Sequence, residues 1–141
     1  MAENFQQCLD KQAQIQRDFS HCMDAEEMHL KIIERGRSLP LLAKEERVEK
    51  YRIAGCQSLL YLKTSLRSEK LAFSAYSNAL ISLGLAAVLI EIYQDELPEV
   101  VLRCPPKVLA KIGVTSSLTP GRMQGVNSLY ARMRLEAALL S

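Results

Sequence analysis

Residues 78–98, NALISLGLAAVLIEIYQDELP, decide the fold of this chain. Apolar residues surround most of the segment instead of marking one side, which predicts a central helix buried on several faces. We expect the helix to run from Asn78, as its N-cap, to about Asp95, and to be ended by Pro98. Its mainly apolar run, residues 79–90, is shorter than the roughly 20 residues that a membrane-spanning helix needs.

Upstream of this segment the hydrophobic pattern alternates, which indicates strands. Leu60 and Leu62 fall on one face, whereas Tyr61 and Lys63 fall on the other. The turn of the resulting hairpin lacks the glycine or asparagine that a tight hairpin prefers. The predicted strands cover residues 58–67 and 70–76, with 52–55 as a candidate third strand.

Helical patterns flank the hairpin on both sides. Asp24 offers a side-chain acceptor at the start of the second helix, and Glu27 completes a capping-box-like pair. Thr119 and Pro120 open the last helix as N-cap and first-turn proline. The predicted helices cover residues 3 to about 21, 24 to about 36, 78 to about 95, 106–112, and 119 to about 140. The apolar contacts expected for the first helix are Phe5, Leu9, Ile15 and Phe19.

Together these elements predict one α+β domain over residues 1–141. A small antiparallel sheet of two or three strands packs against about five or six helices, which cover one face of the sheet. The length of 141 residues fits a single compact core.

Composition and charge describe an ordinary globular chain. Hydrophobic residues make up 48% and charged residues 24%, and the formal net charge is +2, which gives no reason to expect binding to nucleic acid or to a membrane. Residues 99–141 carry 6 basic and 2 acidic residues, an excess that we interpret as solvated surface. Charges throughout the first twenty residues argue against a secretory signal, so we expect a cytoplasmic protein with reduced thiols.

The four cysteines, at positions 8, 22, 56 and 104, form no CxxC pair and so give no support to a zinc ribbon or a redox dithiol. A metal site at His21 and Cys22 is disfavoured, because neighbouring residues on a helix point about 100° apart. We interpret Cys8, Cys22 and Cys104 as packing residues. Cys56 differs because it lies between predicted elements, beside Gly55.

Four segments taken together resemble the SufE family of sulfur acceptors, and they occur in the family's order. They are IIERGRSLP (32–40), GCQS (55–58), ALISLGLAAVLIEIYQDELP (79–98) and LTPGRMQGV (118–126). Within this resemblance Cys56 matches the family's persulfide-forming cysteine, and Arg122 and Gly125 match an arginine and a glycine of the last segment. The sequence departs from the usual family pattern at Gly121, Asn78 and Tyr61, where serine, aspartate and tryptophan are common.

The resemblance implies a fold like that of the iron–sulfur scaffold protein IscU, and a role in sulfur transfer. Cys56 would take sulfur from the persulfide of a SufS/CsdA-type cysteine desulfurase, stimulate that enzyme, and pass the sulfur to a Suf-type scaffold complex for iron–sulfur cluster assembly. Pyridoxal phosphate would belong to the desulfurase, so no cofactor or metal of this chain's own is expected. A homodimer is left open.

Sulfur relay explains why a lone cysteine suffices, since one thiolate can attack the outer sulfur of a donor persulfide. Gly55 would allow a tight turn, and Gln57 and Ser58 would hold the loop by side-chain hydrogen bonds to backbone groups. Arg122 and the first turn of the last helix would stabilise the thiolate if that turn packs near residue 56.

Two other functions compete with sulfur transfer. A stand-alone cysteine hydrolase or thiol peroxidase is disfavoured, because His21 and His29, the only histidines, both lie in the N-terminal helical region. The second is a non-catalytic interaction module that regulates a desulfurase, with residues 39–62 as its docking surface and Cys56 as a packed residue.

Overall fold

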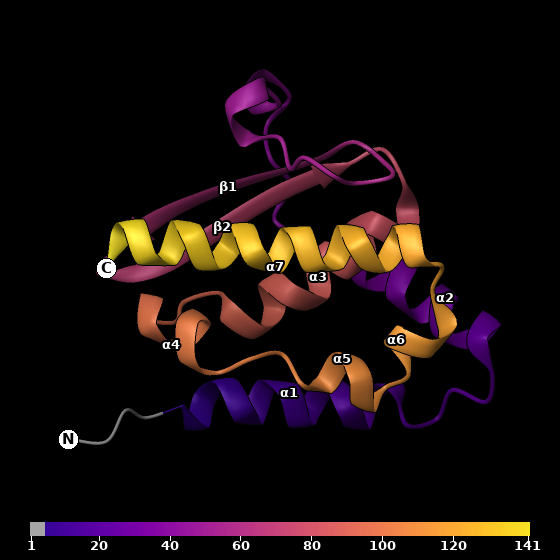
Figure 1. Ribbon diagram of the computed structural model, residues 1–141. Coiled ribbons are helices and arrows are strands. Elements are labelled where there is room, and N and C mark those ends of the chain that lie inside the picture. Colours follow the sequence, from indigo (N-terminus) through magenta and orange to yellow (C-terminus); the bar gives the residue numbers. More distant parts are fainter. Residues whose placement is uncertain (1–4) are drawn as a thin grey trace.

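The computed structural model describes residues 5–141, and this part of the chain contains one two-stranded antiparallel sheet and seven α-helices (Figure 1). The α-helices are α1 (Gln6–Phe19), α2 (Ala25–Arg35), α3 (Leu80–Tyr93), α4 (Pro98–Arg103), α5 (Val108–Lys111), α6 (Val114–Ser117) and α7 (Pro120–Leu140). The strands are β1 (Leu60–Arg67) and β2 (Lys70–Ser77), preceded by the 3-10 helices η1 (Gly36–Ser38), η2 (Lys44–Glu46) and η3 (Glu49–Tyr51). The predicted α+β class is therefore confirmed.

The central helix is α3, as the apolar segment predicted. It packs against α1, α2, β2 and α7, and its buried residues run without a break from Gly84 to Ile90. Because it is enclosed on all these sides, α3 forms the centre of one continuous hydrophobic core. No helix within residues 5–141 is both long and apolar enough to cross a bilayer.

Two glycines let α2 and α3 approach each other closely. A Cβ atom on Gly84 would lie 2.0 Å from the carbonyl oxygen of Ile32, and one on Gly36 would lie 3.2 Å from the backbone nitrogen of Gly84. Backbone atoms on the opposing helix cannot rotate away as a side chain can, so any residue larger than glycine at position 84 must push the two helices apart.

The hairpin turn is tight although it contains no glycine. β1 and β2 pair along their whole lengths, with Leu60 opposite Ser77 at the open end. The two turn residues, Ser68 and Glu69, have positive φ angles of 53° and 71°, as expected for a two-residue turn that follows the strand twist. The predicted position of the turn was correct, and the pairing of the strands holds two side-chain-bearing residues in this conformation.

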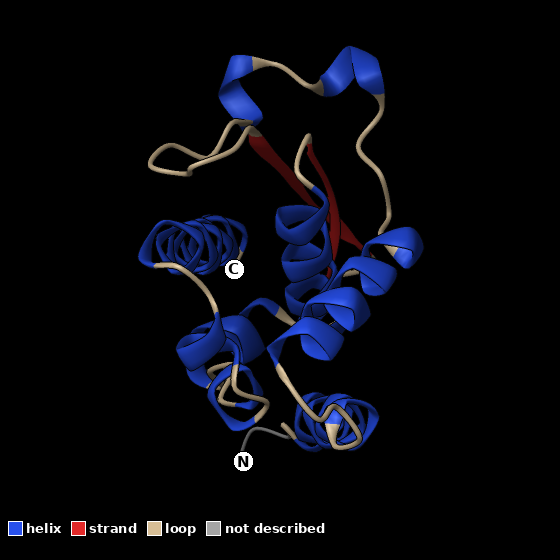
Figure 2. Cartoon of the chain, turned by 90° about the vertical axis from the view of Figure 1, so that its right-hand side faces the viewer, coloured by secondary structure: helices blue, strands red, loops and turns tan. Residues whose placement is uncertain are grey.

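The middle of the connector, residues 43–51, lies beyond the sheet on the side away from α1 (Figures 1 and 2), whereas Leu41 and Arg52 at its two ends bridge to Ala75 and Tyr61 on the strands. The Arg47 guanidinium stacks 3.6 Å from the centre of the Tyr76 ring, and Lys63 on β1 pairs with Glu46. Arg132 on α7 donates to the carbonyl oxygens of Arg52 at 3.2 Å and Lys50 at 2.7 Å. These contacts fix the chain just before Cys56.

Helix capping was predicted correctly at two of three sites. The Asp24 side chain accepts from the backbone N–H of Glu27, and Thr119 accepts from that of Arg122. The prediction for Asn78 was wrong. Its side-chain oxygen accepts instead from the backbone N–H of Leu59 at 3.2 Å, and α3 begins after Ala79 without a side-chain cap.

Other sequence-based expectations also need correction. Residues 52–55 form no third strand, because only Arg52 makes an isolated bridge, to Tyr61, before the chain turns at Gly55. Pro98 does not end the central helix, which already stops at Tyr93; it begins α4 instead, since its fixed φ suits a first helical position. Leu9 is 50% exposed, and Cys8 and Gln12 are buried on its helix instead.

The close approach of α2 and α3 predicts a strong effect of a single added methyl group. We expect Gly84→Ala to lower the free energy of unfolding by about 3 kcal/mol, because it forces the helix backbones apart. Gly125→Ala is the matched control. A Cβ atom there would meet the Cys56 sulfur at an ordinary contact distance of 3.8 Å, and alanine is more favourable than glycine in a helix interior by about 1 kcal/mol, so no such loss of stability is expected. Urea denaturation measures both; equal stabilities of Gly84→Ala and the unsubstituted protein would contradict this packing.

Candidate functional site

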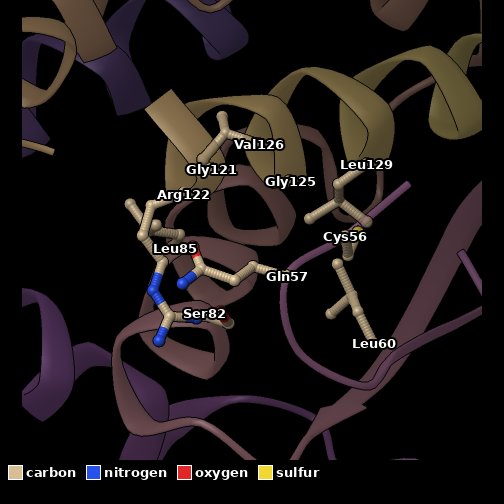
Figure 3. A pocket seen from close by; sticks show the side chains of 10 residues that line it. All are labelled: Cys56, Gln57, Leu60, Ser82, Leu85, Gly121, Arg122, Gly125, Val126 and Leu129. Atoms are coloured by element: carbon tan, nitrogen blue, oxygen red, sulfur yellow. Dashed lines mark hydrogen bonds between the residues drawn. The ribbon is translucent and has the colours of Figure 1, made fainter. Parts of the chain in front are cut away.

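The candidate site is a small pocket between the Cys56 loop, α3 and the first half of α7 (Figure 3). Its volume is about 10 Å³, about the lower limit for holding one water molecule. The pocket is therefore small, with room for about one added atom beside the Cys56 sulfur. It is lined by Cys56, Gln57, Leu60, Ser82, Leu85, Gly121, Arg122, Gly125, Val126 and Leu129.

Cys56 reaches this pocket from a sharp turn. Gly55 has a φ of +78°, a conformation that costs residues with a Cβ atom much more than glycine. Just before the turn, Ile53 donates to the carbonyl oxygen of Leu60 at 2.8 Å. The loop thus leaves and rejoins the sheet within a few residues, and the half-buried Cys56 side chain packs against the hydrophobic core.

The backbone of α7 comes close to the loop because two of its residues are glycines. The Cys56 sulfur lies 3.8 Å from the position that a Cβ atom of Gly125 would occupy. The amide oxygen of Gln57 lies only 2.4 Å from the corresponding position at Gly121. In the present arrangement, the Gln57 side chain occupies space that a serine at position 121 would fill.

A polar network joins the loop to α3 and α7. The Arg122 guanidinium donates to the hydroxyl of Ser58 and, at 2.8 Å, to that of Ser82 on α3. The two hydroxyls are themselves 3.3 Å apart. The hydrogen bonds of Ser58 therefore go to side chains, whereas the sequence suggested backbone partners.

The surroundings of Cys56 favour the protonated form of its thiol. Burial raises the pKa of Cys56 above its usual value, and the positive charge of Arg52 partly lowers it again. Arg122 lies in the same pocket, but its guanidinium is engaged by the two serines. In this conformation the charge that lowers the pKa of Cys56 is that of Arg52 and not, as expected, that of Arg122.

The other cysteines have different surroundings. Cys8 and Cys104 are 0% and 5% exposed, and the Gln12 amide donates to both sulfurs, at 3.6 and 3.9 Å. Burial and the neighbouring Cys104 raise the pKa of Cys8 to about 12. Cys22 is half-buried near the end of α1, so Cys56 is the only cysteine that lines the pocket.

The structure brings together most of the residues that the sequence singled out. Cys56, Gln57, Arg122 and Gly125 line one pocket. Ser58 joins it through Arg122, while Gly55 faces Ser128 and Gln124 on α7. Sequence reasoning missed Arg52 and Ser82. Arg52 gave no signal in the sequence, and Ser82 was hidden inside an apolar helix pattern.

Residues 13–137 match the protein family described as "SufE: Fe-S metabolism associated domain". The chain belongs to the SufE family. The match covers both the Cys56 loop and the first turns of α7, so the candidate site lies wholly within it. SufE membership associates the chain with iron–sulfur metabolism.

The fold is also found in a solved structure. The SufE chain is similar to a hypothetical protein from Thermus thermophilus whose solution structure is known, with a TM-score of 0.76 and 22% sequence identity. The similarity covers 92% of this chain and 95% of the Thermus thermophilus chain, so the two share their overall architecture. Within the described residues of this SufE chain, histidine, cysteine and carboxylate side chains form no cluster of three or more that suits a metal ion.

The charge of Arg52 predicts a measurable effect on the thiol. We expect Arg52→Gln to raise the pKa of Cys56 further, because it removes the positive charge that favours the thiolate. The pH dependence of Cys56 alkylation by iodoacetamide, read from the modified peptide by mass spectrometry, gives this pKa. Arg67→Gln is the control, because Arg67 is the last residue of β1, whereas Arg52 bridges to Tyr61 near the start of that strand. This control should leave the pKa of Cys56 unchanged. An unchanged pKa of Cys56 in Arg52→Gln would refute the role of that charge.

Proposed function

We propose that this protein is a sulfur acceptor that takes sulfur onto Cys56 from the persulfide of a SufS/CsdA-type cysteine desulfurase. The observation that carries the proposal is the position of Cys56, which lies on a loop and is the only cysteine lining a pocket with room for about one added atom. A persulfide differs from a thiol by one sulfur atom. The pocket therefore suits a persulfide better than a bulky substrate.

The transfer is a thiol–persulfide exchange. The Cys56 thiolate attacks the outer sulfur of the donor persulfide, a new S–S bond forms on Cys56, and the donor's S–S bond breaks. The donor cysteine leaves as a thiolate, and the outer sulfur keeps its oxidation state. No added oxidant or reductant takes part, because one sulfur–sulfur bond replaces another.

The surroundings of Cys56 support protection between transfers. Because burial raises its pKa, the resting thiol is mainly neutral, and neutral thiols react slowly with oxidants and disulfides. The pocket contains no second cysteine, so no resolving thiol lies beside a persulfide formed there. The loop must open for the sulfur to reach a partner.

The cofactor and the later steps belong to partner proteins in this proposal. Pyridoxal phosphate is bound by the desulfurase, and this chain needs no cofactor of its own. The sulfur then passes to a Suf-type scaffold complex for iron–sulfur cluster assembly, in the cytoplasm. SufE family membership supports the link to iron–sulfur metabolism.

This function predicts a specific effect of removing one sulfur atom. In a mixture with a cysteine desulfurase and cysteine, the unsubstituted protein should accelerate cysteine consumption, measured as alanine formed per unit time. We expect Cys56→Ser to abolish the acceleration, because an alcohol cannot accept the persulfide sulfur.

Cys22→Ser is the matched control, since Cys22 is also half-buried but lies outside the pocket, and it should retain full acceleration. If Cys56→Ser accelerates the desulfurase as well as the unsubstituted protein does, the protein is a non-catalytic regulatory module. That outcome would overturn the proposal.

A further inference from the structure

We infer that Ser82 is a positioning residue that keeps the Cys56 loop closed by holding Arg122 in hydrogen-bonding reach of Ser58. This inference rests on the proposed function, since a closed loop matters only if Cys56 must alternate between shelter and exchange. The set Ser58, Ser82 and Arg122 is called the polar clamp below.

The polar clamp joins three separate parts of the chain. Ser58 comes two residues after Cys56, Ser82 lies in the first turn of α3, and Arg122 lies in the first turn of α7. One guanidinium nitrogen of Arg122 donates to both hydroxyls. Of the three residues, only Ser58 belongs to the loop, so the other two form its fixed anchor.

The anchor residues are positioned by rigid elements. Arg122 follows the Thr119 cap of α7, whose side chain accepts from the Arg122 backbone N–H. Ser82 is half-buried two residues before Gly84, where α3 contacts α2 most closely. The backbones of both anchors are fixed in helices, so a loop movement beyond the reach of the Arg122 side chain breaks the Arg122–Ser58 bond.

Ser82 contributes because Arg122 lacks a charged partner. Within residues 5–141, Arg122 takes part in no ion pair, and its side-chain hydrogen bonds go to these two neutral hydroxyls. Without the Ser82 hydroxyl, the long Arg122 side chain has one restraint fewer and more accessible rotamers. The bond to Ser58 is then weaker, and the loop opens more often.

The opening frequency can be measured without a desulfurase. Iodoacetamide alkylates the half-buried Cys56 faster when the loop opens and exposes its sulfur, and mass spectrometry of the Cys56 peptide gives the rate. We expect Ser82→Ala to raise this rate about 5- to 10-fold, the effect of removing one hydrogen bond from the closed state. Ser82→Thr, which restores a hydroxyl, should return the rate to near that of the unsubstituted protein.

Ser128→Ala is the matched control. Ser128 lies on α7, and its hydroxyl is 3.5 Å from the position that a Cβ atom of Gly55 would occupy. Ser128 is not part of the polar clamp, so the alkylation rate of Cys56 should not change in Ser128→Ala. Hydrogen–deuterium exchange gives a second readout. In Ser82→Ala, faster exchange should be confined to the loop at residues 54–59, with α3 and α7 protected as before.

Two results would overturn the inference. One is an alkylation rate in Ser82→Ala equal to that of the unsubstituted protein; the other is faster exchange spread through α3, which would indicate a structural defect. Both measurements use the protein alone. Failure of the clamp therefore remains distinguishable from failure of the sulfur-acceptor function, which is measured with the desulfurase.

Discussion

The architecture depends on the close approach of α2 and α3 at Gly84. A helix that is apolar on most of its surface is stable only when other elements enclose it, and α1, α2, β2 and α7 do so here. The contact of Gly84 with the Ile32 carbonyl sets how deeply α3 is buried. Since Ser82 lies one half-turn before this contact and α7 packs on α3, the depth of α3 also fixes the walls of the Cys56 pocket.

The pocket meets two opposing requirements of the proposed sulfur carrier. A thiol that is always exposed and ionised reacts with oxidants and with unrelated thiols, whereas one buried in the core cannot meet a partner. Cys56 lies between these extremes, because the loop that carries it is tied to the helices by side-chain contacts and not by a regular strand. The contact of Gln57 at Gly121 and the hydrogen bonds of Arg122 are local and can be broken without disturbing α3.

Sequence patterns predicted the elements better than the links between them. The apolar segment around α3 and the cap at Thr119 carried strong local signals, and so did the alternation in β1. The error at Asn78 has a physical reason, since its side chain serves the loop at Leu59 instead of its own helix. Gln57 and Ser58 were expected to bind nearby backbone groups. Ser58 instead binds Arg122, more than sixty residues away, and local spacing in the sequence cannot reveal such a distant partner. The family resemblance supplied Cys56 and Arg122, but only the fold places Arg52 and Ser82 around the thiol.

The location of the transferred sulfur tests the central claim most directly. The protein is incubated with a cysteine desulfurase and cysteine, without reductant, and its peptides are then analysed by mass spectrometry. If Cys56 is the acceptor, the mass of one additional sulfur atom appears on the peptide that contains Cys56. Additional sulfur found mainly on Cys8, Cys22 or Cys104 would contradict the account.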